Sequence, residues 1–241
     1  MDSDHKKPFE KPSALAGFNE KYIMKNLLTG SCPICNHMED VVFDFFAKWQ
    51  YVLTTDENVQ REYADELGFC PAHTWQLSTI CSSRGISRGY PKLLEHVADE
   101  LSKGLNTSLN LKDIIAALVK NSESCRVCRL LHDTEEMYMR HFAVFLEQED
   151  ARVAYARSHG VCLRHLSLLV SLLISGEVVQ FLLSETAKLL RETAEDMRRY
   201  VLKHDALERN LINRDEKYAY LHALVHVAGA RNVCAPHIRR I

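Results

Sequence analysis

Apolar residues recur every three or four positions through most of the chain, which is the spacing of one face of an α-helix. This pattern predicts helices over residues 20–28, 57–67, 91–102, 111–119, 151–159, 178–200 and 215–228. The strict apolar and polar alternation of a half-buried strand is absent. The sequence therefore predicts an all-α fold.

The predicted helices have recognisable ends. Asp56 and Asp150 are placed to cap short helices, and Pro71 suits the first turn of the helix that follows it. Glycines stand where the apolar periodicity stops, a usual place for a left-handed terminating residue. These glycines are Gly68, Gly85, Gly104, Gly160, Gly176 and Gly229.

The cysteine spacing contains a repeat. A Cys-x-x-Cys segment at 32–35 is followed, after 34 intervening residues, by Cys-x-x-His at 70–73. A second Cys-x-x-Cys at 125–128 is followed, after 33 intervening residues, by Cys-x-x-His at 162–165. The offset between the halves is 93 residues for the first motif and 92 for the second. This agreement, together with the similar helices at 20–28 and 111–119, indicates an internal duplication.

The repeat predicts how the chain is organised. We expect a flexible tail over residues 1–17, helical metal-binding repeats at 18–105 and 106–204, and a polar connection, final helix and tail over 205–241. No low-complexity linker separates the two repeats, so they are expected to share one core.

The repeated motifs have the composition of metal sites. Three thiolates and one imidazole fill the tetrahedron of a zinc ion, and a tetrahedron filled by protein ligands is typical of a structural site. Helix N-termini at the second motif of each half favour the thiolate form, and Arg126, Arg129 or Arg164 can offset the remaining charge. We predict two zinc sites, one within each repeat: Cys32, Cys35, Cys70 and His73 in the first, and Cys125, Cys128, Cys162 and His165 in the second.

Other chemistry fits parts of this pattern. The same ligand sets can hold iron–sulfur clusters, as in an electron carrier or redox sensor, and exchangeable ions would suit metal storage or sensing. The Cys32 and Cys35 pair also resembles the dithiol of a thioredoxin-type oxidoreductase, although that reading needs a βαβ context and leaves the remaining ligands unexplained.

Several further residues are weaker candidates. Cys234 and His237 form a third Cys-x-x-His without a matching partner, which either is an exposed tail or joins Cys81 in a weaker site. His222 and His226 share a helix face but lack a third ligand. Three histidines do not recur between the halves and are interpreted as non-ligands: His37, His132 and His141. One aromatic cluster is expected to fill the core: Phe43, Phe45, Phe46, Trp49 and Tyr51.

Composition narrows the functional classes. The 241 residues are 46% hydrophobic and carry a net charge of -2, so no general positive field favours nucleic acid or an anionic membrane. The first 18 residues lack the apolar core of a secretory signal, and charges or Gly176 interrupt the most apolar stretch, 161–183. We therefore expect a cytoplasmic protein without a membrane span, in which the eight cysteines are not a disulfide framework.

The segments CPIC at 32–35, GFCPAH at 68–73 and the late stretch 209–217 resemble an uncharacterised bacterial family of cysteine-rich helical proteins, in which CPxC is followed by GFCPxH. The resemblance extends over about residues 22–229. It implies motif positions at Cys32, Cys35, Cys70 and His73. The second half departs from the family pattern, because it lacks the prolines after its first and third cysteines. It implies no activity.

No phosphate-binding loop, nucleophile triad or paired-carboxylate motif stands out. The sequence therefore favours a non-enzymatic zinc protein whose ions stabilise the helical fold and whose surface contacts a protein partner.

Overall fold

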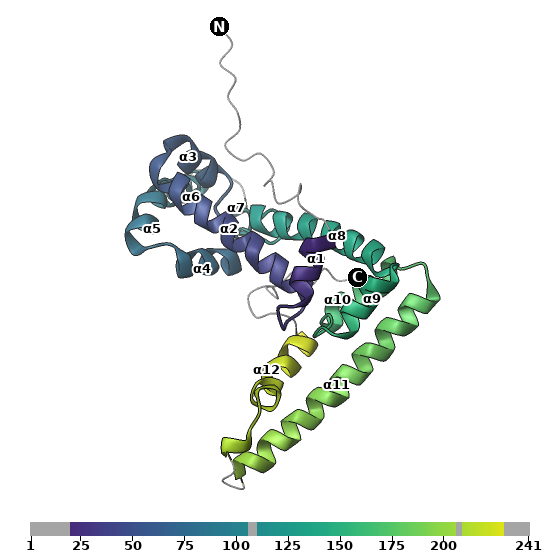
Figure 1. Cartoon of the computed structure of the whole chain (residues 1–241). Coiled ribbons are helices and arrows are strands. Elements are labelled where there is room, and N and C mark those ends of the chain that lie inside the picture. The colour runs from purple at the N-terminus through teal and green to yellow at the C-terminus, as the bar shows by residue number, and fades with distance from the viewer. Residues whose placement is uncertain (1–19, 106–109, 206–208, 229–241) are drawn as a thin grey trace. The chain divides into compact units, whose positions relative to one another are not determined.

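The structure is a computed structural model that describes residues 20–105, 110–205 and 209–228. These residues form helices and contain no strand, which confirms the all-α prediction for them (Figure 1). The helices are α1 (Glu20–Leu27), α2 (Pro33–Thr55), α3 (Glu57–Asp65), α4 (Pro71–Ile80), α5 (Ser83–Gly89), α6 (Pro91–Leu105), α7 (Leu111–Leu118), α8 (Arg126–Leu146), α9 (Glu149–Ala156), α10 (Leu163–Leu172), α11 (Gly176–Asp205), the short 3-10 helix η2 (Arg209–Leu211) and α12 (Arg214–Ala228).

The described residues divide into two compact units. Unit 1 contains residues 20–39 and 134–228, and unit 2 contains residues 40–133. These units differ from the predicted repeats at 18–105 and 106–204, because the unit boundaries fall inside α2 and α8. A helix of 23 residues, such as α2, is about 35 Å long, which exceeds the core of a small helical unit. Each long helix therefore contributes to both units.

Aromatic side chains of α2 form the core of unit 2. Phe45 stacks on Trp49 with ring centroids 5.6 Å apart, and Phe46 meets Phe69 at 5.7 Å. Tyr63 of α3 contacts Phe69 at 5.0 Å. The predicted aromatic core is thus confirmed for the three α2 residues at positions 45, 46 and 49, which are buried.

Two members of the predicted aromatic core are instead on the surface. Phe43 is 58% exposed and Tyr51 is 70% exposed. Positions 43 and 51 lie on the helix face opposite to the buried residues 42, 45, 46 and 49, so the 3.6-residue period separates them from the core. For these two positions the prediction was wrong.

Unit 1 has its own core around α8 and α11. Tyr138 and Phe142 of α8 are fully buried, and Tyr138 receives a hydrogen bond from Asn26 Nδ2 of α1 at 3.3 Å. The last helix, α12, packs along the long helix α11 (Figure 1). Lys203 of α11 donates to both carboxylate oxygens of the buried Glu216 of α12, at 2.6 and 2.7 Å.

The predicted helix ends are partly confirmed. Asp56 caps α3 by accepting from the backbone N–H groups of residues 58 and 59, and Pro71 occupies the first turn of α4. Asp150 is not a cap, because α9 begins one residue before it at Glu149 and has Gln148 at its N-cap. Gly68 and Gly160 adopt positive φ after helices. The other glycines that were expected to terminate helices, Gly85, Gly104 and Gly176, instead lie within helices, and Gly229 is outside the described residues.

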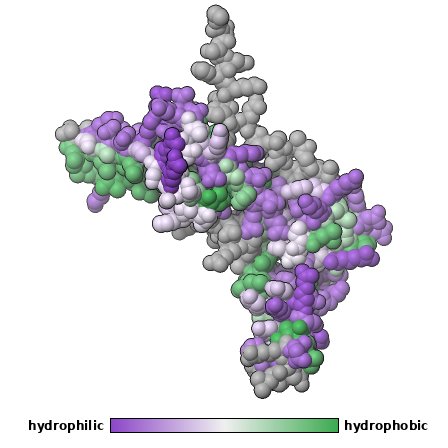
Figure 2. All heavy atoms as spheres, turned by 60° about the vertical axis from the view of Figure 1, so that its left-hand side comes forward, coloured by the Kyte–Doolittle hydropathy of each residue, from purple (hydrophilic) through white to green (hydrophobic). Residues whose placement is uncertain are grey.

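The surface includes an apolar face on the helical hairpin formed by α6 and α7. Hydrophobic residues gather at the left of the view in Figure 2 over these helices. The face consists of exposed side chains at helical spacing: Leu94, Leu101, Leu105, Leu111, Ile115 and Val119. Within the described residues, no helix combines the length and apolar character needed to cross a bilayer.

Candidate metal centres

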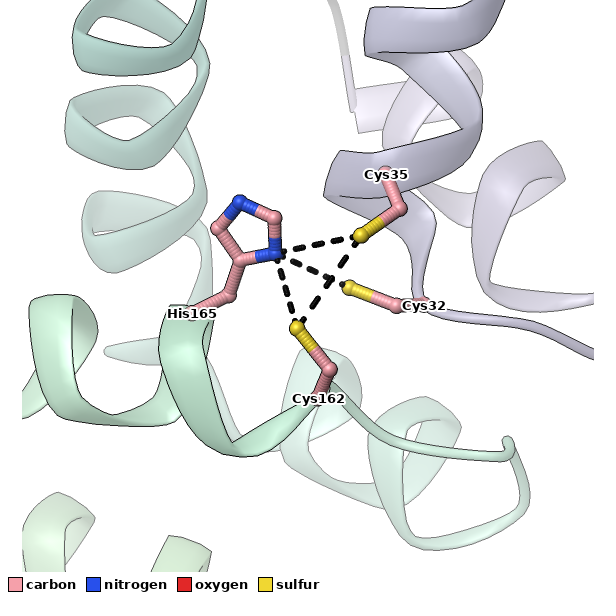
Figure 3. Close-up of side chains that lie close together, drawn as sticks. All are labelled: Cys32, Cys35, Cys162 and His165. Carbon is pink, nitrogen blue, oxygen red and sulfur yellow. Dashed lines mark hydrogen bonds between the residues drawn. The ribbon is translucent and has the colours of Figure 1, made fainter. Parts of the chain in front are cut away.

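Site 1 is built from two helix N-termini of unit 1. Cys32 immediately precedes α2, and Cys35 lies in the first turn of that helix. Cys162 is the N-cap of α10, and His165 lies in its first turn. The Cys162 side chain makes no capping hydrogen bond. Figure 3 shows the four side chains converging.

The four ligand groups of site 1 are close together and buried. Nδ1 of His165 lies 3.2 Å from Sγ of Cys162, 3.3 Å from Sγ of Cys32 and 3.4 Å from Sγ of Cys35 (Figure 3). The sulfurs of Cys35 and Cys162 are 4.0 Å apart. Each residue is at most 1% exposed.

Site 2 has the same construction within unit 2. Cys125 precedes α8 and Cys128 lies in its first turn, while Cys70 is the N-cap of α4 and His73 lies in its first turn. Nδ1 of His73 lies 3.2 Å from the Cys70 sulfur, 3.3 Å from that of Cys128 and 3.6 Å from that of Cys125. The Cys70 and Cys128 sulfurs are 3.6 Å apart.

These separations fit one ion at the centre of each group. A tetrahedron with zinc bond lengths of about 2.3 Å to sulfur and 2.0–2.1 Å to nitrogen has edges of roughly 3.8 Å between sulfurs and roughly 3.6 Å between sulfur and nitrogen. All ligand atoms of each site lie within 4.8 Å of one another. The two Cys₃His groups can therefore hold metal ions.

The structure corrects the predicted pairing of the motifs. The first Cys-x-x-Cys joins the second Cys-x-x-His, giving Cys32, Cys35, Cys162 and His165, and the second Cys-x-x-Cys joins the first Cys-x-x-His, giving Cys70, His73, Cys125 and Cys128. The prediction of one complete quartet within each repeat was wrong.

Helix length explains this crossed pairing. Phe69, next to Cys70, packs against Phe46 and Trp49 of α2. Those two residues are 11 and 14 positions beyond Cys35 along the helix, which corresponds to roughly 16–21 Å at 1.5 Å per residue. The aromatic core therefore holds Cys70 beside the part of α2 that belongs to unit 2.

Without a cation, the thiols of each site compete for protons. Hydrogen bonds from Cys32 and Cys35 hold the pKa of Cys162 well below its usual value, and the hydrogen bond to Cys162 raises the pKa of Cys35. In site 2, hydrogen bonds from Cys128 and Cys70 likewise lower the pKa of Cys125, and the pKa of Cys128 rises. Three neighbouring buried thiols cannot all ionise unless a positive charge balances them. A divalent cation supplies that charge.

The histidines respond to the same thiolates. Burial by itself lowers the pKa of His73, but hydrogen bonds with Cys125 and Cys70 outweigh it and raise that pKa to about 9. For His165 burial also lowers the pKa, while Cys162, Cys32 and Glu135 raise it well above its ordinary value. Each imidazole therefore lies in a strongly negative environment, as a cation site requires.

A carboxylate supports the histidine of site 1. Glu135 of α8 accepts a hydrogen bond from Nε2 of His165 at 2.8 Å, and its second oxygen accepts from Nη2 of Arg164 at 2.8 Å. Burial raises the pKa of Glu135, but the hydrogen bonds from His165 and Arg164 prevail and lower it to about 2. Glu135 is therefore a carboxylate that fixes the imidazole.

The arginines expected to balance the sites are paired with glutamates. Arg164 binds Glu135 in site 1. Beside site 2, Arg126 donates to Glu66 at 2.6 Å and lies over the Trp49 ring at 5.0 Å. Arg129 is exposed. Because each glutamate offsets the charge of its arginine, Arg126 and Arg164 bring little net positive charge to the ligands.

The weaker candidates lie outside both groups. The buried His37 interacts with the Tyr22 hydroxyl at 2.7 Å, and His132 and His141 are exposed. Cys81 is buried between α4 and α5, apart from either quartet. Cys234 and His237 lie outside the described residues. None of the seven cysteines that the structure describes forms a disulfide.

The sequence analysis missed two features of unit 1, one at site 1 and one outside it. Glu135 was not identified, although the 93-residue offset aligns it in sequence with Val42, which is a buried position. A carboxylate at a core position of an amphipathic helix is a signal that the sequence offers. The second feature is His159, whose ring lies 4.3 Å from that of His222. It joins His222 and His226 on α12, and this histidine cluster is not one of the compact ligand groups.

Comparison with known proteins gives one family match. Residues 91–210 match the model of a family of unknown function, DUF6062. The matched range contains Cys125, Cys128, Cys162 and His165, which is half of each site, and excludes the CPIC and GFCPAH segments. Neither the curated proteins nor the solved structures gave a match.

Proposed function

We propose that this protein is a non-enzymatic zinc protein in which two structural ions fix helix N-termini and leave a helical surface for a protein partner. The observation that carries the proposal is the pair of buried Cys₃His quartets, each with its ligand atoms within 4.8 Å. The thiolate ligands suit a reducing compartment, so we propose a cytoplasmic location.

Ligand spacing favours a single zinc ion in each quartet. Separations of 3.2–4.0 Å are those of four atoms around one ion. In a cluster of several irons, cysteines bind different metal atoms, which requires a wider cage. The spacing therefore supports zinc over iron–sulfur clusters as the resident group.

The complete ligand sets favour a structural role. A catalytic zinc site keeps one position for water or substrate, whereas three thiolates and an imidazole occupy all four positions here. The ligands are also buried, so a substrate would have no direct route to the ion. Metal binding would then contribute to folding free energy.

Equivalent residues in the two halves of the sequence support an internal duplication in which each site combines a motif from one half with a motif from the other. Tyr63 and Tyr155 lie 92 residues apart, and each hydroxyl lies 3.2–3.3 Å from the Cβ position of the glycine five residues later. Cys70 and Cys162 have nearly identical backbone angles, with φ of -62° and -69° and ψ of 161° in both. In this proposal each unit takes Cys-x-x-Cys from one half and Cys-x-x-His from the other.

The surface for a partner is proposed to include the apolar α6–α7 face. Its six large aliphatic side chains are between 43% and 76% exposed. Exposed apolar groups of this kind, gathered on neighbouring helices, are typical of interaction sites.

Elemental analysis of anaerobically purified protein tests the proposal. We expect two equivalents of zinc and colourless protein. Removal of both ions by a strong chelator should lower the melting temperature by roughly 15–30 °C, because each ion at about 1,000 times its Kd contributes about 4 kcal/mol, the two together contribute about 8 kcal/mol, and each kcal/mol shifts the melting temperature by about 2–4 °C.

Protein that contains iron and inorganic sulfide would refute the zinc assignment. Full removal of two zinc equivalents with no loss of helicity or melting temperature would refute the structural role. A zinc-reloaded sample serves as the control for damage caused by the chelator.

A further inference from the structure

A cluster of three histidines in unit 1 lies outside both quartets. His159 comes from the loop between α9 and α10, and its ring centroid lies 4.3 Å from that of His222 of α12. His226 follows one turn later on α12 and interacts electrostatically with both. The sequence offered only the pair on α12, and the fold adds a third imidazole from a distant segment.

The face of α12 that carries two of these histidines is directed inward. His226 is 3% exposed, and Ala219, two turns before it, is 1% exposed. His222 lies between them on the helix and is half-buried. Positions 219, 222 and 226 share one face, because residues three and four apart are neighbours on a helix surface. The helix therefore presents two imidazoles, one turn apart, toward His159.

One ring nitrogen of His226 is engaged with the backbone of the loop. Burial lowers the pKa of this imidazole, whereas its hydrogen bond with the Val161 backbone acts in the opposite direction. That direction identifies the Val161 carbonyl as the acceptor, because a bond donated by the ring favours its protonated form. A neutral imidazole that donates from one nitrogen has a lone pair on the other. Metal-binding histidines are commonly oriented by a backbone carbonyl in this way.

The charges around the cluster favour a cation. Asp215 of α12 interacts electrostatically with His159 and His222. Asp196 of α11 interacts with His222, and burial, followed by the charge of Asp215, raises the pKa of Asp196. Burial lowers the pKa of all three imidazoles, which are therefore neutral at pH 7, and neutral imidazole is the form that binds metal. A divalent cation would use these lone pairs and offset the carboxylates.

We propose that His159, His222 and His226 form a third metal site, which binds a divalent transition-metal ion more weakly and more reversibly than the quartets. Imidazole ligands suit zinc and nickel. The three histidines are not one of the compact ligand groups, so the rings must turn about their side-chain bonds to reach one ion. Because the site is not preorganised, its affinity is lower. It shares no ligand with the quartets and does not depend on the proposed structural zinc.

An ion at this site would join α12 to the loop that leads into α10. The loop contributes His159 and Val161, and the next residue, Cys162, is a ligand of site 1. Without that ion, α12 is held by its packing on α10 and α11. The third ion would thus be an exchangeable crosslink within unit 1, and the hold on α12 would depend on the concentration of free metal ion.

Calorimetric titration with Ni²⁺ tests this inference. Ni²⁺ accepts imidazole ligands, whereas thiolate sites select zinc. The protein is dialysed to remove loosely bound ions and keeps the metal of its quartets. We expect the wild type to bind one equivalent of Ni²⁺. His159→Gln and His222→Gln should each weaken binding at least roughly 10-fold, since loss of merely a supporting partner of a ligand costs that much. The control is His132→Gln, an exposed histidine of α8 that should leave binding unchanged.

A wild type that binds no Ni²⁺, or binds it independently of His222, would overturn the inference. Binding that His222→Gln abolishes and His159→Gln leaves intact would also overturn it, because the site would then be a pair on α12 alone. Zinc content of the same samples reports on the quartets, so the proposed function stands or falls separately.

Hydrogen exchange of the wild type supplies a measurement independent of variant folding. Addition of Ni²⁺ should increase the protection of the α12 amides, because the ion ties this helix to the loop. Unchanged protection of α12 at saturating Ni²⁺ would contradict the inference.

Discussion

At the scale of single residues, Gly68 and Gly160 adopt the same unusual backbone conformation two residues before a ligand cysteine. Their φ angles are +70° and +64°. An L-residue in this left-handed region costs roughly 1–2 kcal/mol. The two glycines therefore allow the chain to turn sharply from a short helix into the N-terminus of α4 or α10.

Replacement of either glycine should destabilise the protein. We expect Gly68→Ala and Gly160→Ala each to lower the free energy of unfolding by about 1–2 kcal/mol. At Gly68 the new Cβ would also lie 3.0 Å from a Leu93 methyl group. Gly176→Ala is the matched control, because nothing lies within 4 Å of its Cβ position.

Urea unfolding of the three zinc-loaded variants measures these differences. Equal stability of Gly160→Ala and Gly176→Ala would show that the left-handed turn before α10 contributes nothing to folding.

At the scale of secondary-structure elements, each site consists of two facing helix N-termini. The backbone carbonyls of Cys70 and Cys162 accept the first hydrogen bonds of α4 and α10, at 2.9 and 2.8 Å. The exposed N–H groups and dipole of a helix start favour negative charge. The helices therefore stabilise the thiolates that bind the ion.

The contact between α12 and the loop before α10 is expected to depend on pH. Burial lowers the pKa of His159, His222 and His226 below the ordinary value of 6.5. The rings of His159 and His222 are 4.3 Å apart, and both imidazoles interact electrostatically with His226. The charged or titratable groups around the three histidines are Asp196 of α11, Asp215 of α12 and Cys162.

The direction of the pH effect follows from the lowered pKa values. The unfolded chain binds protons at these histidines more readily than the folded chain, so stability is present above pH 6.5 and is lost as the pH falls through the folded pKa values. We expect hydrogen exchange of the α12 amides, corrected for the intrinsic rate, to show weaker protection at pH 5.5 than at pH 7.5.

A His222→Gln variant provides the comparison for α12. It removes one of the three titrating groups, so its loss of protection between the two pH values should be smaller than that of the wild type. The difference between the two proteins separates the histidine effect from acid release of metal. An identical pH response would contradict the prediction.

At the scale of the whole molecule, the crossed motifs nest one site within the sequence of the other. Among the described residues, unit 2 is one segment, residues 40–133, which lies in the sequence between the two segments of unit 1. The ligands of site 1 come from both of those flanking segments. An ion in site 1 would thus join the two segments of unit 1 to each other.

Metal stoichiometry tests the crossed arrangement. Replacing Cys32 and Cys35 by Ser should remove one zinc equivalent, because four ligands share each ion. Adding Cys162→Ser should remove no more, whereas adding Cys70→Ser should reduce the second equivalent. The reverse result would restore the pairing of motifs within each half. Circular dichroism of each variant verifies that the chain remains helical.

Local patterns in the sequence determined much of this protein. The apolar periodicity predicted the helices that correspond to α1, α3, α6, α7, α9, α11 and α12, but not the long helices α2 and α8. Asp56 and Pro71 predicted helix starts, and the repeated cysteine and histidine motifs identified all eight residues of the two quartets. These features were accessible because helix periodicity, capping and Cys-x-x-Cys geometry act over a few neighbouring residues.

Only the tertiary structure decided which motifs meet and which groups support them. Motif spacing is the same for paired and crossed quartets, so the choice depends on the length of α2 and on the packing of Phe69 against its distal half. Glu135 acquires its role because α8 places it behind His165, 30 residues away in sequence. Both outcomes depend on contacts between distant segments, which local sequence patterns do not encode.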